Sequence, residues 1–395
     1  MPALRRRIPG FDRCVSRRLF LLTLSFANLW TFEAGKSYAM KPERILYIRV
    51  QFADKTIGGG ADGKDISQDL WLKRLRVIDK TAERFWVFNS YGKIAEFQSQ
   101  FTQILTLPAA LAPDSPYESG AKVQLYFNDA LTAATEAGWD LTQFDRTILS
   151  FPGLPKFPAG ALGGESRVWM PGSNPFDGGF IHEFGHAIGV GHASALEGGD
   201  KTYPGEHREG RDGLFMMGSE GGVAPASQRP RRAPINLPMR YKLGFVDESL
   251  VKRISADQGD VYRIYAFDRR NISKDVAQNR TLGIVFQHDK REWWVSYAPS
   301  LVQRWGVDFE GSNHGGSVWR DGVMVHELSG EITRILDFTP GSQGKGNEED
   351  YVDIRDGALR VGQSYTYPDS KLTLAPLKIG KSRDGIAWID VRISF

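Results

Sequence analysis

Three histidines and one glutamate between residues 182 and 192 have the spacing of a metal site. The segment His182-Glu183-Phe184-Gly185-His186-Ala187-Ile188-Gly189-Val190-Gly191-His192 reads H-E-x-x-H-x-x-G-x-x-H. Neutral imidazoles are good zinc ligands, and three of them leave the fourth position of a tetrahedral ion open for water and substrate. Glu183 follows a ligand directly, where its carboxylate can take a proton from a water that the metal activates. The pattern predicts a Zn²⁺ site with His182, His186 and His192 as ligands and Glu183 as the catalytic base.

This spacing requires a helix that ends in a sharp turn. Residues four apart project from one face of a helix, so His182 and His186 can hold one ion. Gly189 is expected to end the helix, because glycine accepts the left-handed conformation that turns the chain back and brings His192 round. The short H-E-x-x-H half also occurs by chance on helices without metal, whereas the five fixed positions together favour a real site. Three histidines without cysteine are typical of a catalytic site, since structural zinc sites usually have four protein ligands.

The extended motif resembles that of the metzincin zinc peptidases, whose sequences continue to a methionine-containing turn under the metal. The resemblance assigns this turn to Met217, which follows His192 by 25 residues, with Met216 as the alternative. One departure is Ser219, which stands where some metzincins have a tyrosine that touches the zinc site, so a tyrosine aid to catalysis is not supported. Shorter stretches resemble gametolysin-like and immune-inhibitor-A-like peptidases: Asn89–Lys93, Gly138–Asp145 and Tyr241–Phe245. The resemblance implies that residues 40–246 form a zincin-like α/β (α+β) catalytic domain with a twisted mixed sheet and a metal-binding helix.

The residues before the motif alternate between strand and helix patterns. Ile45–Phe52 is rich in β-branched and aromatic residues and predicts a buried strand, as does Thr147–Phe151. Ser67 is expected to cap a helix, because apolar residues then recur at steps of three and four: Trp71, Leu75, Ile78, Ala82 and Phe85. One or two further strands are expected up to Pro108, and a second helix from Val123 to Gly138.

The strand just before the metal helix is predicted to rim the cleft. Arg167, Val168, Trp169 and Met170 are expected to form an exposed edge strand, as the resemblance implies for this position. A peptide beside an edge gains main-chain hydrogen bonds as an added strand. The alternative is an ordinary central strand.

The chain between His192 and Met217 is polar and rich in glycine. Its acidic residues include Asp200, Glu206, Glu209 and Asp212, which suggest a solvated loop; a structural Ca²⁺ site is the alternative, but no ligand spacing supports it. His207 is interpreted as a surface histidine, since three ligands are already assigned. Asn236 is expected to cap a short helix with Pro238 in its first turn.

Residues 247–395 have a different texture, with short strand patterns separated by Gly, Asn and Asp turns. Strands are predicted at Val261–Phe267, Leu282–Phe286, Glu292–Tyr297, Val323–Leu328, Ile335–Phe338, Leu372–Ala375 and Ile386–Ile393. Because no long helical pattern intervenes, this region is expected to be an all-β antiparallel sandwich domain.

Residues 1–39 are predicted to be a signal peptide. Six arginines precede the apolar run Leu19–Ala27, and Ser37-Tyr38-Ala39 offers small residues for cleavage after Ala39. Arg17-Arg18 resembles the twin-arginine export signal of bacteria, with an ordinary Sec signal as the alternative. This leader carries seven of the 50 basic and two of the 47 acidic residues, so its removal leaves 43 basic against 45 acidic residues. The net positive charge therefore gives no support to nucleic-acid binding. The single cysteine, Cys14, also lies in the leader. The apolar run of the leader is too short for a membrane span, and no other stretch comes near one.

These patterns predict a secreted bacterial zinc metalloendopeptidase that acts on protein or peptide substrates in the periplasm or outside the cell. One alternative is a zinc-stabilised adhesin or binding module that kept the metal site without turnover. A second is a zinc hydrolase that acts on a non-peptide amide. Cleavage preference and oligomeric state do not follow from the sequence.

Overall fold

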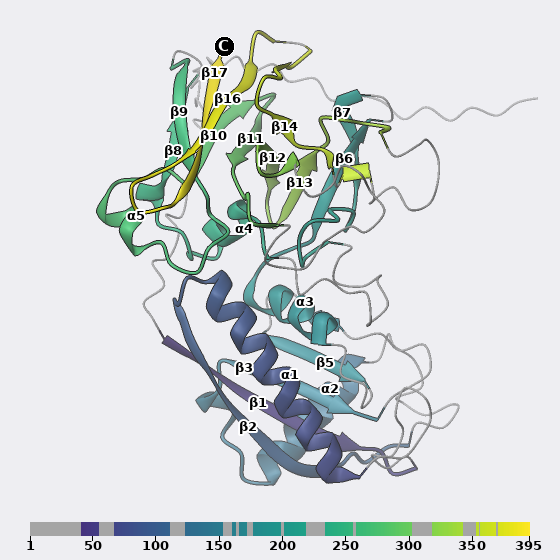
Figure 1. Ribbon diagram of the computed structural model, residues 1–395. Helices are drawn as coiled ribbons and strands as arrows, with labels where there is room; N and C mark the ends of the chain where they lie inside the picture. The colour runs from purple at the N-terminus through teal and green to yellow at the C-terminus, as the bar shows by residue number, and fades with distance from the viewer. Residues whose placement is uncertain are drawn as a thin grey trace, which may run out of the picture. The chain divides into compact units, whose positions relative to one another are not determined.

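A computed structural model describes residues 41–54, 67–110, 123–152, 160–162, 166–171, 177–198, 201–218, 234–255, 258–301, 318–342, 353–354, 356–368 and 370–395. Within these ranges the fold is mixed α/β, with sheets of five, eight and four strands and few helices (Figure 1). The predicted leader, residues 1–39, lies outside the described residues. None of the helices in the described ranges has the length and apolar character to cross a membrane.

The five-stranded sheet is mixed, as the family resemblance implies. Its strands are β1 (Lys41–Gln51), β2 (Ile94–Thr106), β3 (Arg146–Phe151), β4 (Gly160–Leu162) and β5 (Arg167–Pro171), in the order β2-β1-β3-β5-β4. All neighbours are parallel except β4, which is antiparallel to β5. Side chains alternate along β1, because successive residues of a strand point to opposite faces. Ile45 and Tyr47 therefore belong to one core cluster, and Leu46 and Ile48 to another.

Helices cover both faces of this sheet (Figure 1). The first core cluster contains residues of α1 (Gln68–Asn89) and of α3 (Asp177–Ile188), the predicted metal-binding helix, and the second contains residues of α2 (Val123–Glu136). The Ser67 hydroxyl accepts a hydrogen bond from the amide of Leu70 at 3.2 Å, which confirms the predicted cap. The five predicted core residues of α1 are all buried. The periodicity of apolar residues therefore located this helix and its inner face correctly.

The prediction that Arg167–Met170 is an exposed edge strand is wrong. β5 pairs with β3 on one side and with β4 on the other, so β4 is the outermost strand on this side within the described residues. The side chain of Val168 is fully buried in the cluster with α1 and α3, and Trp169 packs against the cluster with α2. β5 is a central strand because three residues of β4, Gly160-Ala161-Leu162, return antiparallel to it, and so short a strand has no recognisable periodicity.

The two remaining sheets contain every strand predicted after residue 247. The four-stranded sheet consists of β15 (Tyr365–Thr366), β16 (Thr373–Lys381), β17 (Ala387–Ser394) and β9 (Asp260–Tyr265), in that order. The eight-stranded sheet has the order β7-β6-β13-β12-β11-β10-β8, with β14 (Leu359–Arg360) on β12. Its other strands are β6 (Ala193–Gly198), β7 (Lys201–Arg208), β8 (Val251–Ile254), β10 (Gly283–His288), β11 (Arg291–Ser296), β12 (Gly322–Ser329) and β13 (Ile332–Leu336). Residues of both sheets share one hydrophobic core. Short helices complete the described chain: α4 (Leu237–Lys242), α5 (Ser273–Ala277) and the 3₁₀ turns Leu141–Gln143 and Glu248–Leu250.

Two features of the eight-stranded sheet differ from the prediction. It is mixed, because β8 runs parallel to β10 and β6 runs parallel to β13. The segment after His192, predicted as a solvated loop, forms strands β6 and β7, and β6 is buried from Ala193 to Leu196. Its pairing partner, β13, lies about 140 residues further along the chain, so no local pattern reveals the strand.

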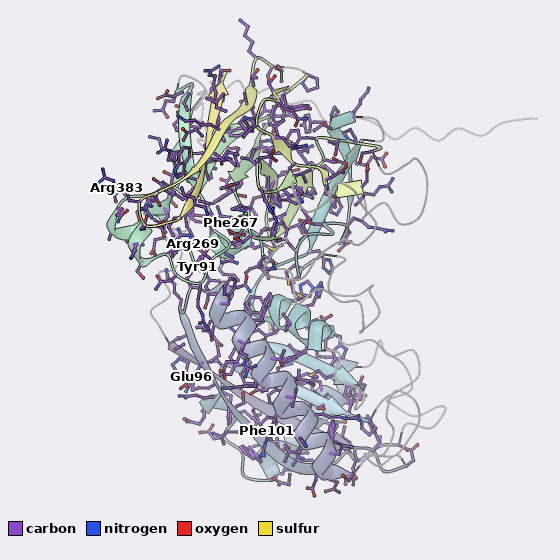
Figure 2. All side chains as sticks on the ribbon, in the orientation of Figure 1. Tyr91, Glu96, Phe101, Phe267, Arg269 and Arg383 are labelled. Atoms are coloured by element: carbon purple, nitrogen blue, oxygen red, sulfur yellow. The ribbon has the colours of Figure 1, made fainter. Side chains whose placement is uncertain are left out.

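Contacts cross the predicted domain boundary between residues 246 and 247. Tyr91, next to Phe267 in Figure 2, donates a hydrogen bond from its hydroxyl to the carbonyl of Phe267 at 2.6 Å. The Lys93 ammonium contacts the Asp247 carboxylate at 2.8 Å. The eight-stranded sheet also takes β6 and β7 from before the boundary. The division into 40–246 and 247–395 stays a prediction, and both segments contribute residues to one core cluster.

Candidate metal centre

The metal-site segment begins on α3 and continues through a tight turn. α3 ends at Ile188, and Gly189 has a backbone φ of 105°, in the left-handed region that glycine tolerates. The amide of Gly189 donates to the carbonyl of His186 at 3.0 Å, and the amide of Val190 donates to that of Gly185 at 3.1 Å. This turn carries His192 back towards the helix, as the spacing of the motif predicts.

The three predicted ligands converge through their Nε2 atoms. The Nε2 of His186 lies 3.1 Å from that of His182 and 3.2 Å from that of His192. All three ligand atoms lie within 4.8 Å of one another. Nitrogens at about 2.0–2.1 Å from a tetrahedral Zn²⁺ would be about 3.3–3.4 Å apart, so the arrangement is close to that geometry. No other group of His, Cys, Asp and Glu in the described ranges could hold a metal ion in this way.

The outer nitrogen of each ring has an acceptor that fixes its tautomer. Nδ1 of His182 lies 2.9 Å from the carbonyl of Met216, and Nδ1 of His186 lies 2.8 Å from that of Val190. Nδ1 of His192 lies 2.8 Å from a carboxylate oxygen of Glu209. Since carbonyls and carboxylates only accept, each Nδ1 must carry the proton, and each Nε2 must present a lone pair. Three lone pairs that face one another are mutually repulsive unless a cation lies between them, so the donor set fits a metal ion.

Sequence reasoning missed Glu209 as a residue of this site. The sequence places it among the acidic residues of an expected solvated loop, and its side chain is 65% exposed. The strands β6 and β7 return the chain so that Glu209, just beyond β7, lies against His192. A carboxylate on the outer nitrogen orients a ligand ring and raises its basicity. Only the hairpin brings Glu209 and His192 together. In the sequence, the only sign of this contact is a carboxylate 17 positions after a predicted ligand.

The protonation states of His182 and Glu183 are set mainly by burial. Burial lowers the pKa of His182 to about 4, with the bond to Met216 opposing the shift, so the ring is neutral and ready to bind a metal. Burial raises the pKa of Glu183 to about 7, which suits a group that accepts and returns a proton near neutral pH.

Met217 lies beneath the metal helix. Its side chain is fully buried, and a Cβ added at Gly185 would lie 2.5 Å from its sulfur, so helix and thioether are in close contact. The neighbouring Met216 supplies the carbonyl that holds His182. These contacts give Met217 the place that the resemblance implies, although its role stays a prediction. Ser219 lies outside the described residues.

The turn between β12 and β13 contacts the segment that carries the third ligand. The amide of Gly191 donates to the carbonyl of Glu331 at 2.9 Å, and the amide of Thr333 donates to that of His192 at 3.3 Å. A Cβ on Gly191 would lie 2.8 Å from the Glu331 carbonyl oxygen, so only glycine fits there without displacement. The turn after the metal helix is therefore held by residues from beyond position 247.

The other histidines of the described residues do not join the site. His207 is exposed and accepts a hydrogen bond from Arg334 at 2.8 Å, as expected for a surface histidine. His326 is fully buried on β12, and His288 ends β10. Asp212, one of the carboxylates weighed for calcium, is fully buried, whereas Glu206 is exposed. His314 and Asp200 lie outside the described residues.

Comparison with known proteins supports a peptidase. The sequence matches the family model described as Peptidase M66 over residues 119–214, which include the three histidines, Glu183 and Glu209. Peptidases of that family are metallopeptidases. The match covers 96 of the 395 residues. No curated protein matches the sequence.

Two solved structures resemble the fold weakly. Both are described as wild-type OgpA from Akkermansia muciniphila, in two crystal forms. The first is 11% identical over 67% of this chain and 72% of that chain, with a TM-score of 0.27. The second is 12% identical over 76% of this chain and 93% of that chain, with a TM-score of 0.30. Similarity at this level carries no argument about function.

Proposed function

We propose that this protein is an exported zinc metalloendopeptidase whose catalytic base is Glu183. The observation that carries the proposal is the convergence of three histidine rings through their Nε2 atoms. The Nδ1 atom of each ring is held by a hydrogen-bond acceptor. In this proposal residues 40–246 are a metzincin-like catalytic domain, and residues 247–395 form a β-sandwich that shares its core. The peptidase family match over residues 119–214 supports hydrolysis of peptide bonds.

Each residue of the site has a definite task. His182, His186 and His192 would hold the metal, and their fixed tautomers keep the lone pairs inward without rearrangement. A bound Zn²⁺ supplies Lewis acidity, which lowers the pKa of water and polarises a carbonyl oxygen. Glu183 takes the proton of the attacking water on its carboxylate and passes it to the amine that leaves the scissile bond. A pKa near 7 allows this carboxyl group to perform both transfers at neutral pH.

The substrate peptide is proposed to lie along β4. This strand pairs only with β5 within the described residues, and it contacts the metal helix α3. An extended peptide beside such an edge gains main-chain hydrogen bonds as an additional strand. β4 thus takes the place of the predicted edge strand Arg167–Met170, and the peptide would pair with its main chain in the same way.

Replacement of the base is the most direct test of the function. Glu183→Gln preserves size and shape but cannot accept the proton, so cleavage of a denatured protein mixture should fall by roughly 10²–10⁴-fold or more. Bound zinc, measured by elemental analysis, and the melting temperature should stay near those of the wild type. His186→Ala is the matched variant: it should lose metal and cleavage together, because it removes a ligand.

The alternative functions predict other results. If chelation by EDTA and Glu183→Gln both leave the released fragments unchanged, the peptidase proposal fails. If the wild type cleaves nothing yet binds a partner in a zinc-dependent manner, the binding module is favoured. Cleavage of amides other than peptides, with protein substrates left intact, would favour the non-peptide hydrolase.

Export by the twin-arginine route is part of the proposal and rests on residues outside the described part of the chain. Arg17→Lys with Arg18→Lys should retain the unprocessed protein inside the cell, because that route reads the arginine pair. Sequencing of the exported protein should find Met40 at its start. Normal export of the double variant would indicate the Sec route.

A further inference from the structure

A buried carboxylate and a buried imidazole meet behind the metal-site loop. Asp212 and His326 are both completely excluded from solvent, and Nε2 of His326 lies 3.6 Å from an Asp212 carboxylate oxygen. At that distance the two groups are in contact, although it exceeds an ordinary hydrogen bond. Neither nitrogen of His326 has a hydrogen-bond partner among the described residues. Buried groups of this kind are costly unless paired, so each is the natural partner of the other.

Asp212 holds together the segments that carry the metal site. Its other carboxylate oxygen accepts from the amide of Leu214 at 3.0 Å, which shapes the turn towards Met216 and Met217. Its backbone amide donates at 3.2 Å to the carbonyl of Ala193, the residue after the third ligand. Its backbone carbonyl lies 2.0 Å from where a Cβ on Gly218 would be, so these backbones are in contact.

Two ligand contacts depend directly on the loop that Asp212 belongs to. Glu209, three residues before it, contacts His192, and Met216, four residues after it, contacts His182. The amide of Ala193 also donates to the carbonyl of Met217 at 2.8 Å, which ties the two ends of the loop together. A shift of Asp212 would therefore move the acceptors of two ligand rings at once.

His326 is distant from Asp212 in the sequence, and its strand is paired on both sides. It lies on β12, opposite Trp294 of β11 and Ile335 of β13 in the sheet register. Its ring also lies 5.6 Å, centre to centre, from that of Phe215 in the loop. Because β12 is paired on both sides, the imidazole is a fixed point against which Asp212 can be placed.

We propose that Asp212 and His326 are positioning residues of the metal centre, through which strand β12 fixes the loop that orients His182 and His192. The pair contacts neither the metal nor a substrate. It positions the loop whose acceptors hold the Nδ1 atoms of His182 and His192. Residues beyond 247 are then part of the metal centre and not only a neighbouring module. This inference rests on the metal site of the proposed function.

The test compares metal binding in folded variants. Asp212→Asn and His326→Gln should each raise the dissociation constant for Zn²⁺, measured in competition with a chromogenic chelator, by about 3- to 10-fold. Loss of a residue that directly supports a ligand typically costs 10–100-fold, and this pair lies one step further away. The visible spectrum of the Co²⁺-loaded protein should also change, because the ligand rings shift. The double variant should lose no more zinc affinity than one of the single variants, since both residues form one contact.

Asp275→Asn is the matched control. Asp275 is equally buried and pairs with Arg269 at 2.5 Å, but it lies on α5, away from the loop. It should lower the melting temperature and leave the zinc dissociation constant and the Co²⁺ spectrum unchanged.

Each outcome decides between the possible roles. If Asp212→Asn and His326→Gln lower the melting temperature like the control and keep wild-type zinc affinity and Co²⁺ spectrum, the pair is merely structural and the inference is overturned. Should His326→Gln not fold, Asp212→Asn decides alone, because an asparagine of the same size can still accept from Leu214. A wild type that binds no zinc would instead overturn the proposed function.

Discussion

Replacing Glu209 by alanine is expected to weaken zinc binding by about 10-fold, which corresponds to about 1.4 kcal/mol. The change removes the acceptor that lies 2.8 Å from Nδ1 of His192. Partners of ligand rings are typically worth 10–100-fold in metal affinity. The low end applies here because the Glu209 side chain is 65% exposed, so water screens its charge and can replace it as an acceptor. The carbonyl partners of His182 and His186 are backbone atoms and cannot be removed in this way.

A chelator competition at constant pH and ionic strength measures the effect. Glu209→Gln retains an oxygen acceptor but loses the charge, so it should fall between the wild type and Glu209→Ala. Glu206→Ala is the control, since this residue lies on β7, three positions before Glu209, is exposed and pairs only with Arg208 among the described contacts. The change removes the same charge from a position three residues away, where the side chain does not contact a predicted ligand.

Three results would refute the reasoning about Glu209. Equal zinc affinity in Glu209→Ala and the wild type would mean that water supports His192 equally well. An equal loss of zinc affinity in Glu206→Ala would mean that the overall negative charge near the site matters, and not the contact of Glu209 with Nδ1 of His192. A fall in melting temperature of the metal-free protein would show that Glu209 stabilises the fold without the metal.

Further changes test the packing and the substrate edge. Gly185→Ala should lower both the melting temperature and the zinc affinity, because the new Cβ would lie 2.5 Å from the sulfur of Met217; unchanged values would show that the methionine can move aside at little cost. Ala161→Pro on β4 should reduce kcat/KM for peptides while zinc content and folding persist, whereas Val168→Pro in the central strand β5 should prevent folding; equal damage by both would place β4 in the core. Burial raises the pKa of Asp337 to about 8, so the folded state keeps a proton that the unfolded state has lost, and stability should fall as pH rises from about 4 to about 8. Asp337→Asn should flatten this dependence in urea titrations, and an unchanged slope would contradict the assigned pKa.

The local part of the site was predictable because it depends on short-range geometry. A spacing of four residues places His182 and His186 on one side of any helix, and Gly189 permits the turn that follows, whatever the rest of the chain does. The same holds for α1, whose apolar residues recur with the helical period and all become buried. The cap at Ser67 and the helix after Asn236 follow equally from neighbouring residues.

The tertiary structure decided the features that depend on pairing between distant segments. Whether β5 is an edge depends on β4, and whether the segment after His192 is a strand depends on β13, about 140 residues away. A strand's hydrogen bonds are made with another strand, so its own residues do not determine its neighbours or its place in a sheet.

The support of the metal ligands belongs to this second class. Glu209 reaches His192 only because β6 and β7 form a hairpin, and Asp212 meets His326 only because β12 lies behind the loop. The motif by itself determined which nitrogens converge as predicted metal ligands, since a helix and one turn suffice to gather them. The carboxylates and carbonyls that orient those atoms come from segments joined by sheet formation, and a hydrogen bond between segments that far apart exists only once the chain has folded.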